Sequence, residues 1–431
     1  MLYIFPDTTV GAMTSSATHP PTVSPAAAIR LLPHGTNVVA APGCGTPETL
    51  LRALGRDADV LGHPTVFSGL QLGAYPFLEA AAQGQLSYRT WHPFGPARAA
   101  LRPGQVDYVP ARASAVPGLL DLWGTDAALV RVSPPDPEGW CSLGPSASYV
   151  CHALARARVV LAEVDVRVPV THGDTRVHVS QLSALVEAEE PACSFPAAAR
   201  DETSDRVAAH VVGLLPDAPV LQLGLGAVPE ALTSFLADAG ATDVRFVGMG
   251  NDAMVDLAEQ GVLAEGPAAV SAAELMGTDR LMRFADDDPR VEVRDSRHAH
   301  DPRVLASLPG LVSVNSAIEV DLWGQVGSEL VGTRQVSGIG GSVDFVEAGF
   351  GSPGGLSVVA LASTTPDGTR SRIVPQLGSP VVTLGRHTPD AVVTEHGVAW
   401  LRGRTVHERA EALAAVAHPD HRDALALPAR S

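Results

Sequence analysis

Short apolar runs rich in β-branched residues alternate with longer helical stretches along most of this chain. The runs typical of strands span residues 37–42, 128–133, 159–165, 218–224, 244–249, 311–316, 356–361 and 391–397. Helical stretches such as TPETLLRALGRDA, RVAAHVVGLL, PEALTSFLADAG and DAMVDLAEQG lie between several of them. Strands that alternate with helices indicate βαβ units and parallel sheets. The sequence therefore predicts an α/β protein built on open parallel sheets.

The chain is also too long for one hydrophobic core. Its 431 residues favour two domains. The segment EAEEPACSFPAAARDETSDRV at 187–207 interrupts the alternating pattern with acidic residues and prolines, and we place the domain boundary there. The prediction is a flexible N-terminal tail at 1–24, an N-terminal domain at 25–195 and a C-terminal domain at 196–431.

Charge and composition exclude several classes of function. The formal net charge of -17 argues against nucleic-acid binding, which needs clustered basic residues. The sequence contains no lysine, which excludes a lysine Schiff base and a P-loop lysine. It also contains no GxSxG motif, so a hydrolase of the nucleophile-elbow type is not expected. A small anionic ligand held by arginines or backbone N–H groups is compatible with this composition.

Cysteine and hydropathy patterns bear on the cellular setting. The four cysteines show no CxxC spacing, as expected for free thiols in a reducing cytosol. No apolar run reaches the roughly 18–20 residues that span a bilayer, so we expect a cytoplasmic protein without membrane contact. The histidine pairs in RHAHD and HPDHRD lack further ligands at zinc spacing and look like exposed loops, so no metal site is predicted.

Two glycine-rich stretches are candidates for binding. In LQLGLGAVPEAL, Gly224 and Gly226 follow a strand and precede a helix, an arrangement that suits an anion or a developing oxyanion; the alternative is an ordinary βα turn. In SGIGGSVDFVEAGFGSPGG, Gly340 and Gly341 precede Asp344 and Phe345, which is typical of a ligand-wrapping loop or lid, or of a flexible surface connection. We expect the glycine clusters at 224–226, 338–341 and 349–355 to lie at the carboxyl ends of the strands, where ligands bind in open α/β sheets.

Carboxylates and amides after strands are candidates for catalysis. SVNSAIEVDLWGQVGSEL places Asn315, Glu319 and Asp321 after a strand. Either carboxylate is a candidate acid, base or nucleophile; the alternative is a solvated or paired carboxylate. VTEHGVAWLRGRTVHERA places a Glu-His pair at a strand end, for ligand orientation or for capping. The strand-to-helix turn in RFVGMGNDAMVDLAEQGV carries Asn251 and Asp252.

These motifs together resemble the acetyl-CoA hydrolase/transferase family, which includes 4-hydroxybutyrate and butyryl-CoA:acetate CoA-transferases. The resemblance rests on their order from about residue 25 onward. The motifs are VRVSPPDPEGWCSLG, VPVTHGDTRVHVS, LGLGAVP, VNSAIEVDLWGQV, GIGGSVDFVEAG, TPDGTRSRIVP and VVTEHGVAWLRGRTVHERA. The resemblance implies two open parallel-sheet domains of the CoA-transferase (NagB/RpiA-like) fold, with coenzyme A in the cleft between them. It further implies an acyl-CoA and a small carboxylate as substrates, and a homo-oligomer.

The resemblance also implies site residues. A glutamate on the second domain attacks the thioester in such enzymes, and backbone N–H groups, here those of Gly226 and Ala227, stabilise the oxyanion. Gly224, Gly340, Gly341, Asp344, Phe345 and Asn315 fall on segments that bind coenzyme A.

The usual catalytic glutamate is missing from this chain. VDLAEQGV fixes the register at 255–262, and counting back without a gap puts Gly248 at the position of the glutamate. A local deletion would bring Asn251 or Asp252 near that position.

Three readings follow from the missing glutamate. The first is a CoA-transferase that uses Asp252, or an acyl-CoA hydrolase in which Asp252 or Glu319 activates water. The second is an acyltransferase that passes the acyl group from coenzyme A or another carrier to a non-carboxylate acceptor. The third is a non-catalytic acyl-CoA-binding protein.

Overall fold

The computed structural model describes residues 20–425. Residues 1–19 of the predicted tail at 1–24 therefore lie outside the described residues. Within the remainder of that segment, Thr22 forms a parallel bridge with Leu185, and Ser24 caps the first helix, α1 (Pro25–Ile29), by accepting from Ala27 N. The chain from Thr22 onward is thus paired with the first sheet.

The first half of the chain forms a seven-stranded sheet in which every neighbouring pair is parallel. Its order is β10 (Ala184–Glu187), β7 (Val159–Val164), β5 (Ala127–Val132), β1 (Asn37–Ala40), β2 (Thr65–Ser68), β3 (Ser87–Thr90) and β4 (Val106–Tyr108). One face packs against α1, α2 (Glu48–Arg56) and α3 (Pro76–Ala82), and the other against α5 (Val116–Trp123) and α6 (Val150–Arg156). This is a three-layer arrangement with the sheet buried between helices.

The second half forms a nine-stranded sheet that is parallel except at one edge pair. Its order is β23 (Gly397–Trp400), β22 (Ala391–Thr394), β20 (Leu356–Ala360), β15 (Leu311–Asn315), β11 (Val220–Leu223), β12 (Arg245–Gly250), β13 (Val270–Leu275), β14 (Val291–Val293) and β8 (His172–Gly173). The helices α7 (Glu202–Val212), α8 (Ala227–Asp238), α9 (Ala253–Glu259) and α10 (Asp279–Ala285) cover one face. On the other face lie α12 (Pro302–Ala306) and α13 (Ser342–Gly351).

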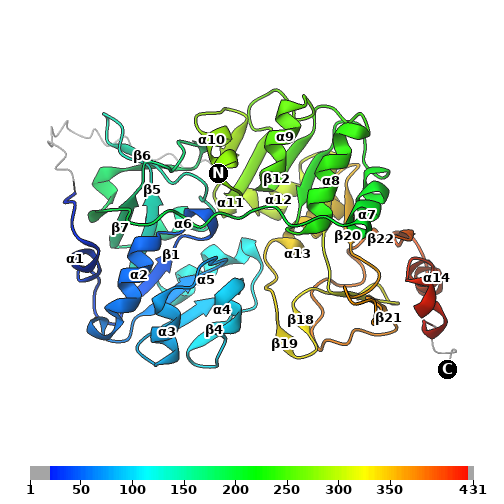
Figure 1. Cartoon of the computed structure of the whole chain (residues 1–431), viewed down its shortest axis with the longest axis horizontal. Helices are drawn as coiled ribbons and strands as arrows, with labels where there is room; N and C mark the ends of the chain where they lie inside the picture. Colours follow the sequence, from blue (N-terminus) through cyan, green and yellow to red (C-terminus); the bar gives the residue numbers. More distant parts are fainter. Residues whose placement is uncertain (1–19, 426–431) are drawn as a thin grey trace, which may run out of the picture.

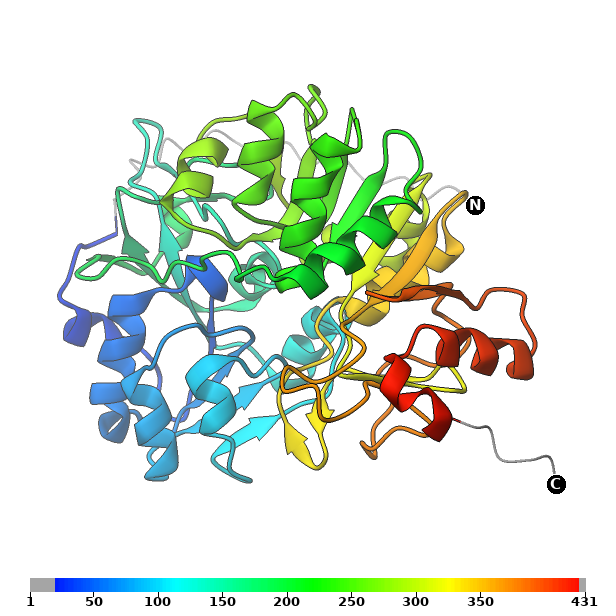
Figure 2. The ribbon, with the colours of Figure 1, turned by 45° about the vertical axis from the view of Figure 1, so that its right-hand side comes forward.

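The two halves lie side by side and are tied together at several points (Figures 1 and 2). Strand β8 belongs to the first half of the sequence, yet it pairs with β14 at the edge of the second sheet. A smaller sheet of β17 (Val326–Gly327), β16 (Glu319–Asp321) and β21 (Ile373–Val374) packs with α14 (Val406–Ala415) in a separate apolar cluster. The predicted α/β fold with open parallel sheets is confirmed.

Two expectations about glycine-rich segments were wrong. Residues 342–351 were expected in a loop but form α13, because Phe345, Val346 and Ala348 pack into the core and this burial outweighs the glycine content. The cluster at 349–355 lies at the amino ends of β15 and β20, where Gly355 approaches the carbonyl of Leu311 so closely that a Cβ would sit 2.8 Å from that oxygen. That cluster therefore serves close backbone packing at the edge opposite to the carboxyl ends.

One histidine pair also lies elsewhere than expected. RHAHD was expected in an exposed loop, yet α11 (Ser296–Ala299) covers its start, and His300 is buried with 9% of its surface exposed.

Candidate active site between the two domains

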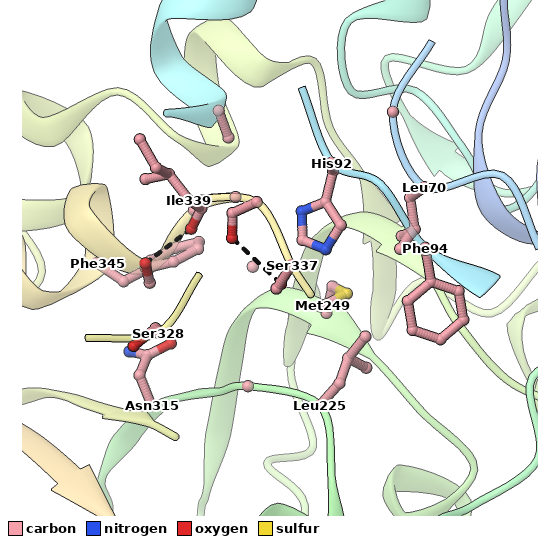
Figure 3. A pocket seen from close by; sticks show the side chains of 18 of the residues that line it. Leu70, His92, Phe94, Leu225, Met249, Asn315, Ser328, Ser337, Ile339 and Phe345 are labelled. Atoms are coloured by element: carbon pink, nitrogen blue, oxygen red, sulfur yellow. Dashed lines mark hydrogen bonds between the residues drawn. The ribbon is translucent and has the colours of Figure 1, made fainter. Parts of the chain in front are cut away.

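A cavity of about 480 Å³ opens between the two sheets, where the carboxyl ends of their strands face each other. Figure 3 shows His92 and Phe94 from the first half facing Leu225, Met249 and Asn315 from the second. Most of the side chains around it are apolar. Its volume lies within the roughly 300–1,000 Å³ typical of small-molecule sites, which makes it the candidate active site.

The glycine segment at 338–341 forms one wall of this cavity and presses against the first domain. A Cβ on Gly338 would lie 2.3 Å from the carbonyl oxygen of Trp91, and Gly340 adopts a φ of 58° and accepts a hydrogen bond of 2.8 Å from Ala113 N. Only glycine allows this approach and this backbone conformation. Gly340 and Gly341 both line the cavity, as expected for a segment that contacts a ligand.

The turn between β11 and α8 forms the opposite wall. Gly224 and Leu225 line the cavity, Gly226 has a φ of 131°, and Ala227 begins α8. Within residues 20–425, no side chain caps the N-terminus of this helix, so its first N–H groups have no side-chain acceptor there. Gly226 and Ala227 do not themselves line the cavity, and their oxyanion role stays a prediction.

Position 248 has no room for a side chain. Gly248 has a φ of 94° next to a β-bulge in β12, and a Cβ there would lie 2.7 Å from Cζ of Phe345. Both residues line the cavity. Since Phe345 occupies the space that a side chain would need, the backbone and the packing both favour glycine here.

Asp252 and Asn251 lie outside the cavity lining. The carboxylate of Asp252 accepts hydrogen bonds from Thr278 N at 3.0 Å, Thr278 Oγ1 at 2.9 Å and Leu281 N at 3.1 Å, at the start of α10. The amide of Asn251 donates to Glu230 at 3.3 Å. Asp252 thus caps the start of α10, and Asn251 contacts a side chain of α8. The catalytic roles of both residues stay predictions.

Glu319 also lies outside the cavity lining. One of its carboxylate oxygens accepts from Gly378 N at 2.7 Å and from Ser379 N at 3.0 Å, which holds the 378–379 turn against β16. The predicted Glu-His pair, Glu395 and His396, lies outside the lining too, and Glu395 likewise accepts from a backbone N–H, that of Ser363, at 2.9 Å. The structure therefore does not bring these carboxylates together with the glycine-rich walls.

Asn315 does lie in the cavity wall, whereas Asp344 lies behind it. Asn315 donates to Gln222 Oε1 at 2.8 Å, forming an amide pair across β15 and β11. Asp344 is fully buried and accepts from Ser114 N at 3.0 Å and Ser114 Oγ at 2.6 Å, so it joins α13 to the first domain. Burial raises the pKa of Asp344 to about 6, and the contacts with Ser114 oppose this rise.

Sequence reasoning missed one carboxylate in the cavity. Glu274 lies on β13 and is 7% exposed, and neither of its carboxylate oxygens has a hydrogen-bond partner among residues 20–425. Burial raises its pKa to about 8, and the nearby hydroxyls of Ser146 and Ser148 oppose the rise without forming hydrogen bonds of ordinary geometry. The signal was available as one acid inside the apolar run AAVSAAELM.

Two histidines, the half-buried His92 and the buried His300, line the cavity as well. Burial lowers the pKa of His92 and of His300 to about 4, so both imidazoles are neutral near pH 7. In the described part of the chain, no group of three or more His, Cys, Asp or Glu is arranged to hold a metal ion. Within the same part, no helix is both long enough and apolar enough to cross a membrane.

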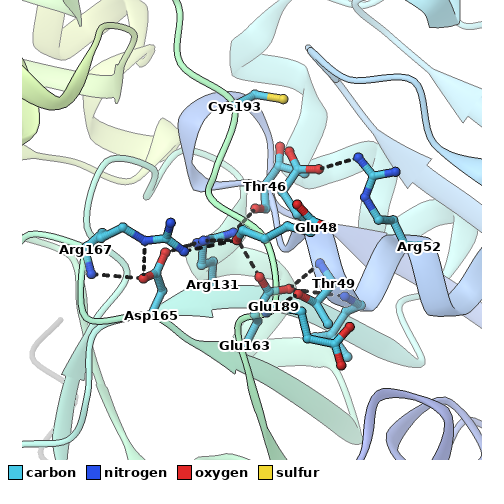
Figure 4. Close-up of polar contacts among 12 residues, drawn as sticks. Thr46, Glu48, Thr49, Arg52, Arg131, Glu163, Asp165, Arg167, Glu189 and Cys193 are labelled. Carbon is cyan, nitrogen blue, oxygen red and sulfur yellow. Dashed lines mark hydrogen bonds and ion pairs between the residues drawn. The ribbon is translucent and has the colours of Figure 1, made fainter.

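A second cluster of charged side chains lies outside the cavity, in the first domain (Figure 4). The side chain of Arg131 is fully buried and donates to Glu163 at 2.9 Å and to Asp165 at 3.0 Å. Glu163 in turn accepts from Thr49 N at 2.8 Å and Leu50 N at 3.1 Å in the first turn of α2. This network ties α2 to β5 and β7, and its groups are saturated with partners, so we assign it to stability.

Two family models match most of this chain. The Acetyl-CoA hydrolase/transferase N-terminal domain matches residues 18–196, and the C-terminal domain of the same name matches residues 277–429. The two matches leave residues 197–276 between them, the segment that contains Gly248 and Glu274.

Whole-chain relatives extend the match across this segment. 4-Hydroxybutyrate coenzyme A transferase of Clostridium kluyveri is 34% identical over 92% of this chain and 94% of its own length. Butyryl-CoA:acetate CoA-transferase of Anaerostipes caccae is 32% identical over 88% of this chain and 89% of its own. The crystal structure of RipA from Yersinia pestis is 28% identical and superposes with a TM-score of 0.86, covering 94% of this chain and 96% of RipA. The chain therefore belongs to the acetyl-CoA hydrolase/transferase family, and it is an enzyme of the CoA-transferase or acetyl-CoA hydrolase kind that uses coenzyme A thioesters.

Proposed function

We propose that this enzyme cleaves an acyl-CoA thioester in the cavity between its domains, and that no side chain at position 248 carries the acyl group. The observation that carries the proposal is the packing of Phe345 over Gly248 inside that cavity. The proposed active site thus differs from the one that the family resemblance implies, in which a glutamate stands at this position.

The cavity walls support the binding of a thioester. Its apolar lining suits a pantetheine arm and a short acyl chain, and Arg98 lies at its rim, where a cation would face coenzyme A phosphates. The uncapped start of α8, with the N–H groups of Gly226 and Ala227, is the proposed oxyanion site. Gly224, Gly340, Gly341, Phe345 and Asn315 line the proposed coenzyme A site, and Asp344 supports its wall.

A cationic side chain in the cavity is suited to a carboxylate. Arg372 lines the cavity and donates to the backbone carbonyls of Ile318 and Ala317, and none of the described carboxylates forms an ion pair with it. An acyl-acid product or a small acceptor carboxylate would supply the missing negative charge. The homo-oligomeric state and the cytoplasmic location stay predictions.

The test is thioester cleavage by the purified enzyme. Acetyl-, butyryl- and succinyl-CoA are incubated with it, with and without acetate, and free thiol and newly formed acyl-CoA are measured. Thiol release or acyl exchange supports the proposal. If all three thioesters persist under both conditions while coenzyme A still binds, the proposal fails and the non-catalytic or acyltransferase readings replace it.

A further inference from the structure

Three buried polar side chains, those of Ser146, Ser148 and Glu274, meet where the first domain packs against β13. The segment at 145–148 of the first domain runs alongside β13: Leu275 N donates to Pro145 O at 2.8 Å, Ser148 N donates to Ala273 O at 3.3 Å, and Ser146 and Glu274 form an antiparallel bridge. The two hydroxyls and the carboxylate are thereby brought together across the domain interface.

All of these polar atoms lack hydrogen-bond partners within the described residues. Ser146 Oγ, Ser148 Oγ and both carboxylate oxygens of Glu274 are buried and unpaired. Burying a carboxylate without donors costs several kcal/mol, so such a group is retained mainly where it serves function. Glu274 and Ser148 both face the cavity.

The cluster has the composition of a water site. A buried water molecule typically makes two to four hydrogen bonds, and two hydroxyls with one carboxylate supply this number. Glu274 also lies close to Gly248. Strand β13 pairs with β12, and Glu274 is opposite Met249, the residue that follows Gly248. A water molecule held by Glu274 would therefore lie next to the cavity in which we propose that the thioester binds.

We propose that Glu274 is the general base of this enzyme, that Ser146 and Ser148 help it hold the attacking water, and that the acyl acceptor is therefore water. This rests on the proposed function. The water oxygen bonds to the thioester carbonyl carbon while its proton moves to Glu274. The C–S bond then breaks, and the proton on Glu274 passes to the departing thiolate, giving a free acid and coenzyme A.

The surroundings of Glu274 suit this role. Cys44 and Tyr149 are titratable side chains that interact with its charge; burial raises the pKa of Cys44 to about 12 and that of Tyr149 well above its usual value, so both stay neutral. No arginine or histidine among the described residues forms an ion pair with Glu274. A carboxylate whose pKa lies near 8 is a strong base once ionised, as general-base catalysis requires.

The experiment compares Glu274→Gln with Glu292→Gln, the same change on the neighbouring strand β14 outside the cavity lining. Acetyl-, butyryl- and succinyl-CoA hydrolysis is followed by thiol release, and coenzyme A binding by calorimetry. We expect Glu274→Gln to lower kcat by about 100-fold or more, as for loss of a general base, with unchanged coenzyme A affinity. Glu292→Gln should keep the wild-type rate.

Two further measurements separate base catalysis from other roles. The wild-type rate should rise with pH through an apparent pKa well above the ordinary 4.5 of glutamate, and this rise should vanish in the residual rate of Glu274→Gln. Ser148→Ala should lower kcat by about 2- to 10-fold, the worth of one hydrogen bond to the water. After many turnovers in oxygen-18 water, the peptide containing Glu274 should carry no label.

Several outcomes would overturn the assignment while leaving the proposed function intact. These are full activity of Glu274→Gln, label or an acyl adduct on Glu274, and acyl exchange that occurs only with added acetate. Loss of coenzyme A binding together with activity in Glu274→Gln would show a structural role and would also overturn it. Absence of any thioester cleavage by the wild-type enzyme would instead refute the proposed function itself.

Discussion

Replacing Gly248 by alanine tests the claim that the cavity wall excludes a side chain at this position. The new Cβ would lie 2.7 Å from Phe345, on a residue with a φ of 94°. A non-glycine residue in a strained conformation costs about 1–3 kcal/mol, and overpacking costs about 1–3 kcal/mol more, so the loss of stability should total about 2–6 kcal/mol. Urea unfolding followed by tryptophan fluorescence measures it.

Two comparisons divide this loss into its parts. Gly240 has a φ of 71° and open space around it, so Gly240→Ala should cost only the backbone strain, about 1–2 kcal/mol. Adding Phe345→Ala to Gly248→Ala removes the clash, and the double mutant should be about 1–3 kcal/mol more stable than the two single effects predict. If Gly248→Ala is as mild as Gly240→Ala, or if no such coupling is found, the steric argument is refuted.

Three other predictions concern charged side chains and their partners. Arg131→Met should cost about 3–5 kcal/mol in urea unfolding, because it leaves Glu163 buried without its cation and removes one of the two arginines that pair with Asp165; a loss under about 1 kcal/mol would contradict this. Burial raises the pKa of Glu274 from 4.5 to about 8. As the pH rises through this range, the carboxyl ionises in the unfolded chain before it ionises in the folded protein, so the wild type loses stability. The stability advantage of Glu274→Gln over wild type should therefore grow from pH 5 to pH 8 in thermal melts, and a constant difference would disprove the pKa shift. Asp252→Ala should cost about 1–2 kcal/mol, because Thr278 and Leu281 lose their acceptor at the start of α10; an unchanged melting temperature would show that this cap is dispensable.

The sheet strands show what periodicity can reveal. Runs such as 159–165 and 311–316 were recognised because parallel strands buried on both faces are almost continuously apolar, and β7 and β15 confirm them. The strands β3 (SYRT) and β4 (VDY) were not recognised, since they are short and mix polar with apolar residues near one edge. Pairing with neighbouring strands, rather than local pattern, makes them strands.

Within the site, the chain by itself determined the elements with strict local requirements. Glycines at 224, 340 and 341 and the amide of Asn315 were identified as candidates because backbone conformation and strand ends leave marks in the sequence, and all four line the cavity. The order of the motifs likewise identified the family. These features depend on a residue and its immediate neighbours along the chain.

The tertiary structure alone decided which carboxylate faces the cavity. Asp252 and Glu319 look as reactive as Glu274 in sequence, but N–H groups brought by other segments donate to the first two. The carboxylate oxygens of Glu274 have no hydrogen-bond partner within residues 20–425 and lie beside the hydroxyls of Ser146 and Ser148 from the other domain. The reactivity of a carboxylate is set by burial and by the donors around it, which come from residues distant in the chain. That distribution of partners exists only once both domains have packed together.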